Sequence, residues 1–429
     1  MHQREAVAIV CIVGVVSGCG GTTSTTQRLP AEVIRTPAGS GGVNHPSVID
    51  RPHVVLVSFD GFRPDYLDRV TTRHFDELAR SGVIADGLIP VFPSLTFPSH
   101  YSIATGLYPE HHGIVGNRFY DPLRDEEFNY RESSDAQDGS WWGGEPIWLT
   151  AERQGMVAAT MFFPGSEAAI GGIHPTHWHS YDATVPNVAR VTQALDWLGT
   201  DPSVRPHLIT LYFSLVDGIG HDHGPDNSNI DDAIRRADQL LGRLLDGIGR
   251  LAHAAQVYVV VVSDHGMATV DPAQQIVLPK VVDLHGVRAI PTGPAMSLYV
   301  AGDNARGLAL RDRFNIKVNN ARAYLRDDIP TRLHLRESVR TADILIVPKE
   351  GVLVGFRHDP SPPAGMHGWD PQLPSMHGIF LMGGPSVDPG QRIEAFENVH
   401  VYPLLTAILR LRPNPNIDGR LALLEHLIR

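Results

Sequence analysis

The sequence predicts an α/β fold, a doubly wound and mostly parallel sheet flanked by helices, with a small inserted α+β subdomain. Three continuous apolar runs rich in β-branched residues cover residues 54–59, 207–216 and 256–263. Such runs are typical of strands buried on both faces of a parallel sheet. A helical pattern lies between the second and third runs, and alternating strands and helices indicate a doubly wound domain.

The helical pattern is clearest over residues 230–251, where apolar residues recur at helical spacing after cap candidates at residues 227–229. Residues 303–355 differ from the rest, because they combine a polar helical stretch with short strands such as residues 343–347. We expect this segment to form the small inserted subdomain.

Length and charge limit the function. A chain of 429 residues suits one large α/β enzyme with insertions. Its 47 acidic and 36 basic residues give a net charge of −11, with no dense cluster of Lys or Arg. A protein that follows nucleic-acid phosphates needs a basic surface, so we expect no binding of nucleic-acid duplexes. Attraction of an anionic substrate then requires a local source, such as bound metal cations.

The N-terminus predicts export. Residues 6–16 form an apolar run that is too short to span a bilayer but is typical of a secretory signal. The run leads into Val-Val-Ser-Gly-Cys19, which resembles a bacterial lipobox with cleavage before Cys19 and lipidation of its thiol. A plain signal peptide cut nearby is the alternative. We expect an exported protein of the cell envelope, lipid-anchored to a bacterial membrane and facing the periplasm.

This interpretation divides the chain into a signal peptide at residues 1–18, a lipidated Cys and flexible tether at 19–50, and a catalytic domain at 51–429. The tether is rich in Thr, Gly, Ser and Pro. Both cysteines, Cys11 and Cys19, precede the domain. A metal in the domain must therefore use nitrogen and oxygen ligands.

Each of the three predicted strands stops at an aspartate, namely Asp60, Asp217 and Asp264. Ligands of open α/β sheets bind outside the carboxyl ends of the strands, so these carboxylates are expected to converge. A single Asp-Gly after a strand is usually only a turn. Three such ends, two of them with histidines nearby at His221 and His265, indicate a functional site.

A further histidine, His377, follows a loop rich in Gly, Pro and His. Three aspartates and three histidines offer mixed imidazole and carboxylate ligands, which suit zinc, with manganese or iron as alternatives. Two zinc ions need more than six protein groups, and substrate or water would fill the remaining positions. His367 is expected only to support the loop that carries His377.

Thr96 lies just before a helix predicted from about Ser99 to Thr105. A hydroxyl at the start of a helix is most often an N-cap. Helix N-termini also bind phosphate, and a metal-bound threonine alkoxide is a strong nucleophile. His100, one turn after Thr96, is expected to be a supporting or structural residue.

The motifs resemble, in order, those of the nucleotide pyrophosphatase/phosphodiesterases of the alkaline phosphatase superfamily, bacterial type. They span about residues 53 to 412 and read VVLVSFDGFRPDYL, FPSLTFPSHYSIATGLYPEHHGIVGN, EPIW, FPGSEA, LYFSLVDGIGHDHGP, VVVVSDHGM, HGWD and MHGIF. The resemblance implies an alkaline phosphatase-like fold, and residues 398–405 are similar to the family's terminal helix. It also implies a phosphodiesterase that binds two Zn²⁺ ions.

The resemblance assigns roles to single residues. One zinc would be held by Asp60, Thr96, Asp264 and His265, and the other by Asp217, His221 and His377. Asn117 would help the backbone N–H of Thr96 to bind a phosphate oxygen. Phe97 and Tyr181 match aromatic positions that enclose a nucleobase, and Tyr212 is a further candidate for the pocket lining. Tyr181 and Tyr212 could equally be core aromatics.

The implied reaction is zinc-dependent hydrolysis of phosphodiester or pyrophosphate bonds in nucleotides, releasing a nucleoside monophosphate. Thr96 would attack phosphorus to form a covalent phospho-threonine ester, and water would release the product with retained configuration. The alternatives are a phospholipid or choline phosphodiesterase, a phosphomonoesterase of the same superfamily, and a catalytically dead lipid-anchored binding module. The expected partners are a small-molecule nucleotide or other phosphodiester and, through Cys19, a membrane; the oligomeric state stays open.

Overall fold

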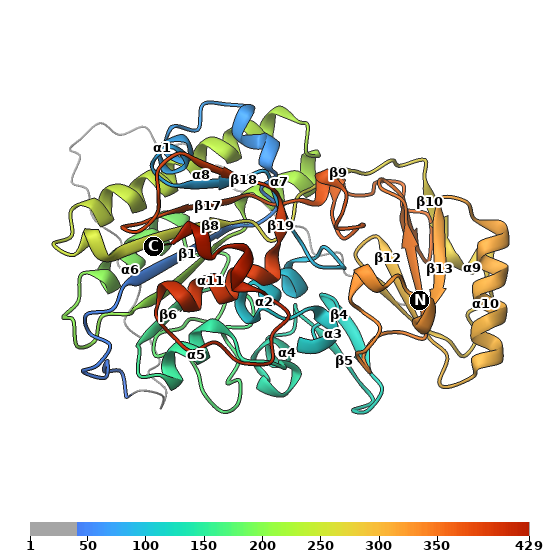
Figure 1. Ribbon diagram of the computed structural model, residues 1–429. Coiled ribbons are helices and arrows are strands. Elements are labelled where there is room, and N and C mark those ends of the chain that lie inside the picture. Colours follow the sequence, from blue (N-terminus) through green and yellow to red (C-terminus); the bar gives the residue numbers. More distant parts are fainter. Residues whose placement is uncertain (1–40, 429) are drawn as a thin grey trace, which may run out of the picture.

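The central element is a seven-stranded sheet, seen in a computed structural model that describes residues 41–428 (Figure 1). Its strand order is β18–β2–β17–β8–β1–β7–β6. The four strands from β8 to β6 pair in parallel, whereas β17 is antiparallel to both of its neighbours. The strands are β1 (His53–Phe59), β2 (Val83–Ala85), β6 (Ala158–Met161), β7 (Leu208–Phe213), β8 (Val257–Val262), β17 (Phe380–Gly383) and β18 (Gln391–Ile393). The predicted class, a mostly parallel sheet, is confirmed.

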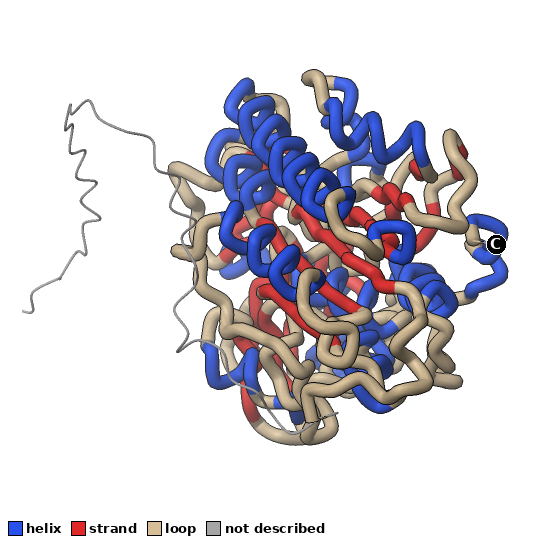
Figure 2. Tube along the Cα trace, turned by 90° about the vertical axis from the view of Figure 1, so that its left-hand side faces the viewer, coloured by secondary structure: helices blue, strands red, loops and turns tan. Residues whose placement is uncertain are grey.

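Both faces of this sheet are buried under helices, as the views in Figures 1 and 2 show. Along β1, Val54 and Leu56 face one apolar core, and Val55 and Val57 face the other. This explains why the strands read as continuous apolar runs. The first core is covered by α2 (Thr96–Thr105), α5 (Ile147–Arg153) and α11 (Val401–Ile408); the second is covered by α1 (Arg73–Ser81), α6 (Asn187–Leu198) and α8 (Ser228–Gly249).

Two predicted helices occur where the sequence places them. The predicted helix 230–251 is α8, and the side chain of its N-cap Asn227 accepts a hydrogen bond from the backbone N–H of Asn229. The predicted terminal helix over 398–405 corresponds to a short 3₁₀ turn followed by α11. In α8, the Asn227 cap satisfies one of the N–H groups that a helix start leaves without a partner.

The second apolar run does not end as predicted. Strand β7 stops at Phe213, and the following Leu215 and Val216 already belong to α7 (Leu215–His223). Asp217 therefore lies in the first turn of a helix and not directly after a strand. Periodicity cannot mark this boundary, because apolar residues continue from the strand into the helix.

A second, smaller sheet lies to one side of the main body, where the yellow and orange segments of Figure 1 gather. Its four antiparallel strands run in the order β11–β12–β14–β13, and its inner face packs on α10 (Asn304–Lys317). The strands are β11 (Arg288–Thr292), β12 (Ala295–Tyr299), β13 (Ala321–Leu325) and β14 (Ile344–Pro348). Because β12 pairs with β14, this unit includes residues that precede the predicted segment 303–355.

Short strands and helices complete the described chain. Two-stranded pairs are formed by β4 with β5, β9 with β16, β10 with β15, and β3 with β19. Their bounds are β3 (Leu88–Ile89), β4 (Arg118–Asp121), β5 (Glu126–Asn129), β9 (Ala268–Thr269), β10 (Gln275–Val277), β15 (Leu353–Gly355), β16 (Gly365–Met366) and β19 (Phe396–Glu397). The short helices are α3 (Pro109–His112), α4 (Ser133–Gln137) and α9 (Leu278–Val281).

The predicted signal peptide, Cys19 and most of the predicted tether lie outside the described residues. The described end of the tether corrects the prediction, because Asn44 and Val48 are buried against the domain. The Asn44 side-chain amide donates to the carbonyls of Pro202 and Arg205, and these hydrogen bonds hold the segment against the domain. Within residues 41–428, no helix has the length and apolar character needed to cross a membrane.

Candidate active site

Asp60, Thr96, Asp217 and Asp264 meet at the carboxyl edge of the central strands. Asp60 directly follows β1, and Asp264 follows β8 after one residue. Asp217 comes from the first turn of α7, and Thr96 is the first residue of α2. The sheet edge and the two helix starts therefore bring Asp60 and Thr96 together with Asp217 and Asp264, which lie more than a hundred positions later in the sequence.

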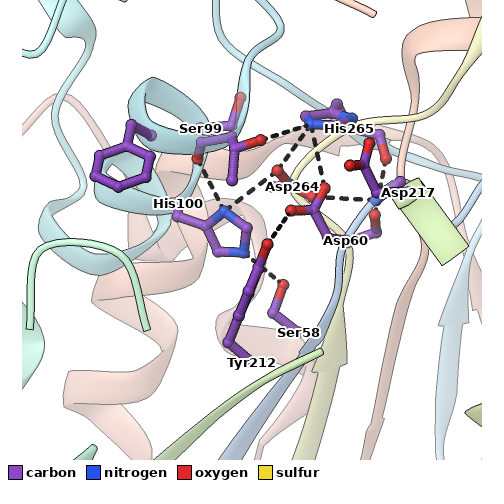
Figure 3. Close-up of polar contacts among 12 residues, drawn as sticks. Ser58, Asp60, Ser99, His100, Tyr212, Asp217, Asp264 and His265 are labelled. Atoms are coloured by element: carbon purple, nitrogen blue, oxygen red, sulfur yellow. Dashed lines mark hydrogen bonds and ion pairs between the residues drawn. The ribbon is translucent and has the colours of Figure 1, made fainter. Parts of the chain in front are cut away.

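One group combines Asp60, Asp264 and His265, whose ligand atoms all lie within 4.8 Å of one another. The Nε2 atom of His265 lies 3.3 Å from Oδ1 of Asp60 and 3.0 Å from Oδ2 of Asp264. The hydroxyl of Thr96 lies 3.4 Å from the same nitrogen. Figure 3 shows the two carboxylates between His265 on one side and His100 and Tyr212 on the other.

A second group combines Asp217, His265 and His367, again within 4.8 Å. Oδ1 of Asp217 lies 3.4 Å from Nε2 of His221 and 3.6 Å from Nε2 of His367. The ring of His367 stacks on that of His265, with the ring centroids 3.5 Å apart. The two groups share His265 and are therefore adjacent.

His377 is not part of either group, and this corrects the sequence assignment. Its ring packs against Gly87, where an added Cβ would approach its Nδ1 to 3.0 Å. Both His367 and His377 stand in a Met-His-Gly context, so local sequence does not separate them. Their tertiary positions do: His367 follows β16, which lies beside α7, whereas His377 precedes β17 of the central sheet.

The hydrogen bonds of three histidines orient their free nitrogens toward the carboxylates. Each Nδ1 lies 2.8–2.9 Å from a backbone carbonyl: His265 at Gly266, His221 at Gly365 and His367 at Ser94. A neutral imidazole has one N–H, and a carbonyl can only accept, so Nδ1 carries the proton and Nε2 a lone pair.

The carboxylate oxygens that face these nitrogens also lack donors. Oδ1 of Asp60, Oδ1 of Asp217 and Oδ2 of Asp264 are buried and accept no hydrogen bond. Lone pairs of nitrogen and oxygen that face one another at 3.0–3.6 Å repel unless a cation lies between them. The donor set, imidazole nitrogen and carboxylate oxygen, therefore fits a divalent metal ion.

His100 behaves differently and has the supporting role expected of it. Its Nδ1 lies 2.8 Å from the carbonyl of Thr96 and 3.2 Å from Oδ2 of Asp264. Its Nε2 lies 2.7 Å from the hydroxyl of Ser58. Because both ring nitrogens have protein partners, His100 orients the Thr96 turn and Asp264 and is not itself placed as a metal ligand.

The pKa values of the three buried carboxylates at the site are shifted in different directions. Burial, with the neighbouring carboxylates of Asp264 and Asp217, raises the pKa of Asp60 well above its usual range. Burial also raises the pKa of Asp217, against the opposing effect of His221. Burial acts on Asp264 in the same direction, but the imidazoles of His100 and His265 outweigh it and hold that pKa well below its usual range. A bound cation would relieve the repulsion among these groups.

Thr96 is not the N-cap of α2. The N-cap is Leu95, which makes no side-chain cap hydrogen bond, and Thr96 is the first helical residue. Its hydroxyl therefore points toward His265 and does not close the helix end. The backbone N–H of Thr96 also has no partner within the helix, as at every helix start, and is available to an anion.

Asn117, at the base of β4, reaches the same helix start. Its side-chain Oδ1 accepts a hydrogen bond of 2.9 Å from the backbone N–H of Phe97. This contact with the N–H of Phe97 fixes the Asn117 amide beside the Thr96 turn. The remaining NH₂ group is the part of Asn117 that can bind a ligand.

A cavity of about 480 Å³ opens beside Thr96 and is lined by Phe97, Phe162, Tyr181 and Tyr212. Tyr181 is 45% exposed, so it is a cavity wall and not a core residue. Tyr212 is buried, and its hydroxyl donates a hydrogen bond of 2.6 Å to Oδ2 of Asp60. The aromatic faces make this cavity suitable for a flat ring.

A second cavity, of about 690 Å³, lies on the other side of Thr96 and contains Asn117, Arg118, His221 and His367. Both cavities are lined by Thr96, Asp217, Tyr130 and Arg131. Sequence reasoning missed Tyr130 and Arg131. No motif marks these two residues, because only the β4–β5 hairpin brings them over the site.

The fold and the site define an α/β protein of alkaline phosphatase-like architecture with grouped metal-ligand residues around a helix-start threonine. The family model described as Type I phosphodiesterase / nucleotide pyrophosphatase matches residues 54–370. The chain belongs to this family, as its motifs predicted.

Curated relatives are about one-third identical to the chain over the aligned residues. It is 35% identical over 402 residues to a venom phosphodiesterase of Crotalus durissus collilineatus, covering 91% of this chain and 48% of the relative. It is 33% identical over 423 residues to human ectonucleotide pyrophosphatase/phosphodiesterase family member 1, covering 96% and 45%. The chain thus spans about half the length of these two relatives.

Solved structures agree in fold. Murine ectonucleotide pyrophosphatase/phosphodiesterase 5 superimposes with a TM-score of 0.83 at 31% identity, covering 88% of this chain and all of that chain. An inactive variant of that murine protein, with one threonine replaced by alanine, is solved in complex with AMP; it gives the same TM-score and identity over 89% of this chain and all of that chain.

Proposed function

We propose that the protein is a zinc-dependent phosphodiesterase that hydrolyses phosphodiester or pyrophosphate bonds in nucleotides and releases a nucleoside monophosphate. The observation that carries the proposal is the set of buried carboxylate oxygens without donors that face imidazole lone pairs beside the Thr96 hydroxyl. Relatives named as phosphodiesterases and nucleotide pyrophosphatases support it.

The residues divide into two ligand sets around the nucleophile. Asp60, Thr96, Asp264 and His265 would hold one zinc ion, and Asp217, His221 and His367 the other. Bound metal ions would lower the pKa of a coordinated hydroxyl and place positive charge beside the reacting phosphate. His367 takes the place that the sequence assigned to His377.

Thr96 is the nucleophile of this reaction. Its Oγ1 attacks phosphorus, the bond to the leaving group breaks, and a covalent phospho-threonine ester forms. The backbone N–H of Thr96 and the amide NH₂ of Asn117 hold a phosphate oxygen during this step. Water then attacks phosphorus from the side that the leaving group vacated, the bond between phosphorus and Oγ1 of Thr96 breaks, and Thr96 regains its proton as the nucleoside monophosphate is released. Two in-line displacements retain the configuration at phosphorus.

The aromatic cavity accounts for a nucleoside arm. Phe97 and Tyr181 offer ring faces on which a nucleobase stacks, a contact worth about 1–3 kcal/mol per base in other nucleotide-binding proteins. The murine relative solved with AMP supports a nucleotide as ligand. This cavity favours nucleotides over a phosphomonoester, and over a choline or phospholipid diester, which would require a cation cage or a lipid tunnel.

Two further parts of the proposal concern the chain around the site. The dead binding module is disfavoured, because Thr96 and both carboxylate–imidazole groups are present. The lipobox-like residues before Cys19 support export and lipid anchoring of the domain at a bacterial membrane, facing the periplasm.

The test is a rate comparison on purified, zinc-loaded protein. We expect fast turnover of bis-p-nitrophenyl phosphate and ATP, and slow turnover of p-nitrophenyl phosphate and p-nitrophenyl phosphorylcholine. A preference for p-nitrophenyl phosphate would contradict the diesterase proposal, and a preference for the phosphorylcholine substrate would contradict the nucleotide arm.

A further inference from the structure

We propose that Tyr212 is a positioning residue for the metal ligand Asp60, a role carried by its hydroxyl. This inference rests on the proposed function, because it assigns Asp60 to a metal ion. Tyr212 lines the aromatic cavity, and its hydroxyl in addition controls how the Asp60 carboxylate presents its oxygens.

The two residues are brought together by neighbouring strands. Tyr212 in β7 pairs in register with Ser58 in β1, two residues before Asp60. The Tyr212 hydroxyl donates to Oδ2 of Asp60 at 2.6 Å, the length of a strong hydrogen bond to a carboxylate. Figure 3 shows the hydroxyl approaching Asp60 from below, with His265 above the carboxylates.

The hydrogen bond distinguishes the two oxygens of Asp60. Oδ2 accepts from Tyr212, while Oδ1 accepts no hydrogen bond and lies 3.3 Å from Nε2 of His265. Tyr212 therefore fixes the rotation of the carboxylate and presents Oδ1 to the metal position. Removal of a residue that holds a metal ligand in this way commonly lowers metal affinity or activity by about 10–100-fold.

Tyr212 is itself held on several sides. The guanidinium of the buried Arg190 donates to the Tyr212 backbone carbonyl at 2.8 Å. The Tyr212 ring packs edge-on against the rings of His100 and Tyr181, with centroids 5.3 and 6.2 Å apart.

Tyr181 and Tyr212 are neighbours, but we assign them different roles. Tyr181 is 45% exposed and offers a ring face to the cavity, whereas Tyr212 is 8% exposed and its hydroxyl donates a hydrogen bond to Asp60. Loss of the hydroxyl should therefore affect metal binding and turnover. Loss of the Tyr181 ring should affect nucleotide binding.

The experiment compares Tyr212→Phe with Tyr181→Ala in the full chain. Zinc affinity is measured by competition with a chelating indicator, and kcat and KM are measured with the p-nitrophenyl ester of thymidine 5′-monophosphate. For Tyr212→Phe we expect about 10–100-fold weaker zinc binding or a kcat lower by that factor, with KM within about twofold of wild type. Tyr181→Ala should instead raise KM and leave zinc affinity unchanged.

Tyr66→Phe is the matched control, because Tyr66 is fully buried and its hydroxyl has no hydrogen-bond partner in the described chain. It should bind zinc and turn over substrate like wild type, which separates the Asp60 contact from general loss of a buried hydroxyl. Wild-type zinc affinity and kcat in Tyr212→Phe would overturn the inference, as would a selective rise in KM. A wild-type protein that binds no zinc would instead refute the proposed function.

Discussion

Replacing His367 and His377 separately by alanine tests which histidine completes the second ligand set. Nε2 of His367 lies 3.6 Å from Oδ1 of Asp217, whereas His377 packs against Gly87 outside both groups. His367→Ala should therefore weaken zinc binding at that set, and His377→Ala should not.

The magnitude follows from the number of ligands. The proposed second set has three protein ligands, so His367→Ala would leave two. Loss of an outer partner costs about 10–100-fold in metal affinity, and loss of a direct ligand should reach at least about 100-fold, or about 2.7 kcal/mol. His367 also stacks on His265 at 3.5 Å, so its removal loosens a ligand of the first set.

The assay is metal content after dialysis against buffered zinc, together with the rate of diester hydrolysis. We expect His367→Ala to lose about one zinc per chain and most of its activity, while His377→Ala retains both metals. Because both variants remove an imidazole from a Met-His-Gly segment, each serves as the control for the other. Full metal content in His367→Ala, with loss in His377→Ala, would refute the assignment.

Three other predictions follow from the described contacts. Thr96→Ala should abolish turnover while most zinc binding survives in the dialysis assay; near wild-type rates would exclude Thr96 as nucleophile. Phe97→Ala should raise KM for a nucleotide about 10-fold from lost stacking, with bis-p-nitrophenyl phosphate affected less. Burial and the adjacent His207 lower the pKa of His53 to about 3, so the unfolded chain takes up this proton first as pH falls below about 6.5. Urea unfolding should therefore show about 1.6 kcal/mol less stability at pH 5 than at pH 6.5 from this residue, a loss that His53→Phe should remove.

The sequence predicts the parts of the site that follow buried strands. Asp60 and Asp264 come after runs that are apolar at nearly every residue, as expected of strands whose two faces are both covered. The prediction for Asp217 is correct for its position at the site and wrong for its place directly after a strand. Asp217 lies on a helix, where His221 follows one turn later at the i+4 position.

The remaining differences depend on tertiary contacts that no local pattern contains. His367 and His377 share a Met-His-Gly context, and only the placement of β16 beside α7 and of β17 in the sheet separates them. Tyr130 and Arg131 reach the site through a hairpin with no motif of its own. The role of Tyr212 rests on a single cross-strand hydrogen bond, which composition and periodicity do not encode.

Zinc titration of metal-free protein tests the central claim most directly. The protein is stripped with a chelator and titrated while release of p-nitrophenol from the thymidine 5′-monophosphate ester is followed. The carboxylate and imidazole groups around Thr96 predict no turnover without metal and a rate that saturates at two zinc ions per chain. Full turnover by the metal-free protein would contradict the account.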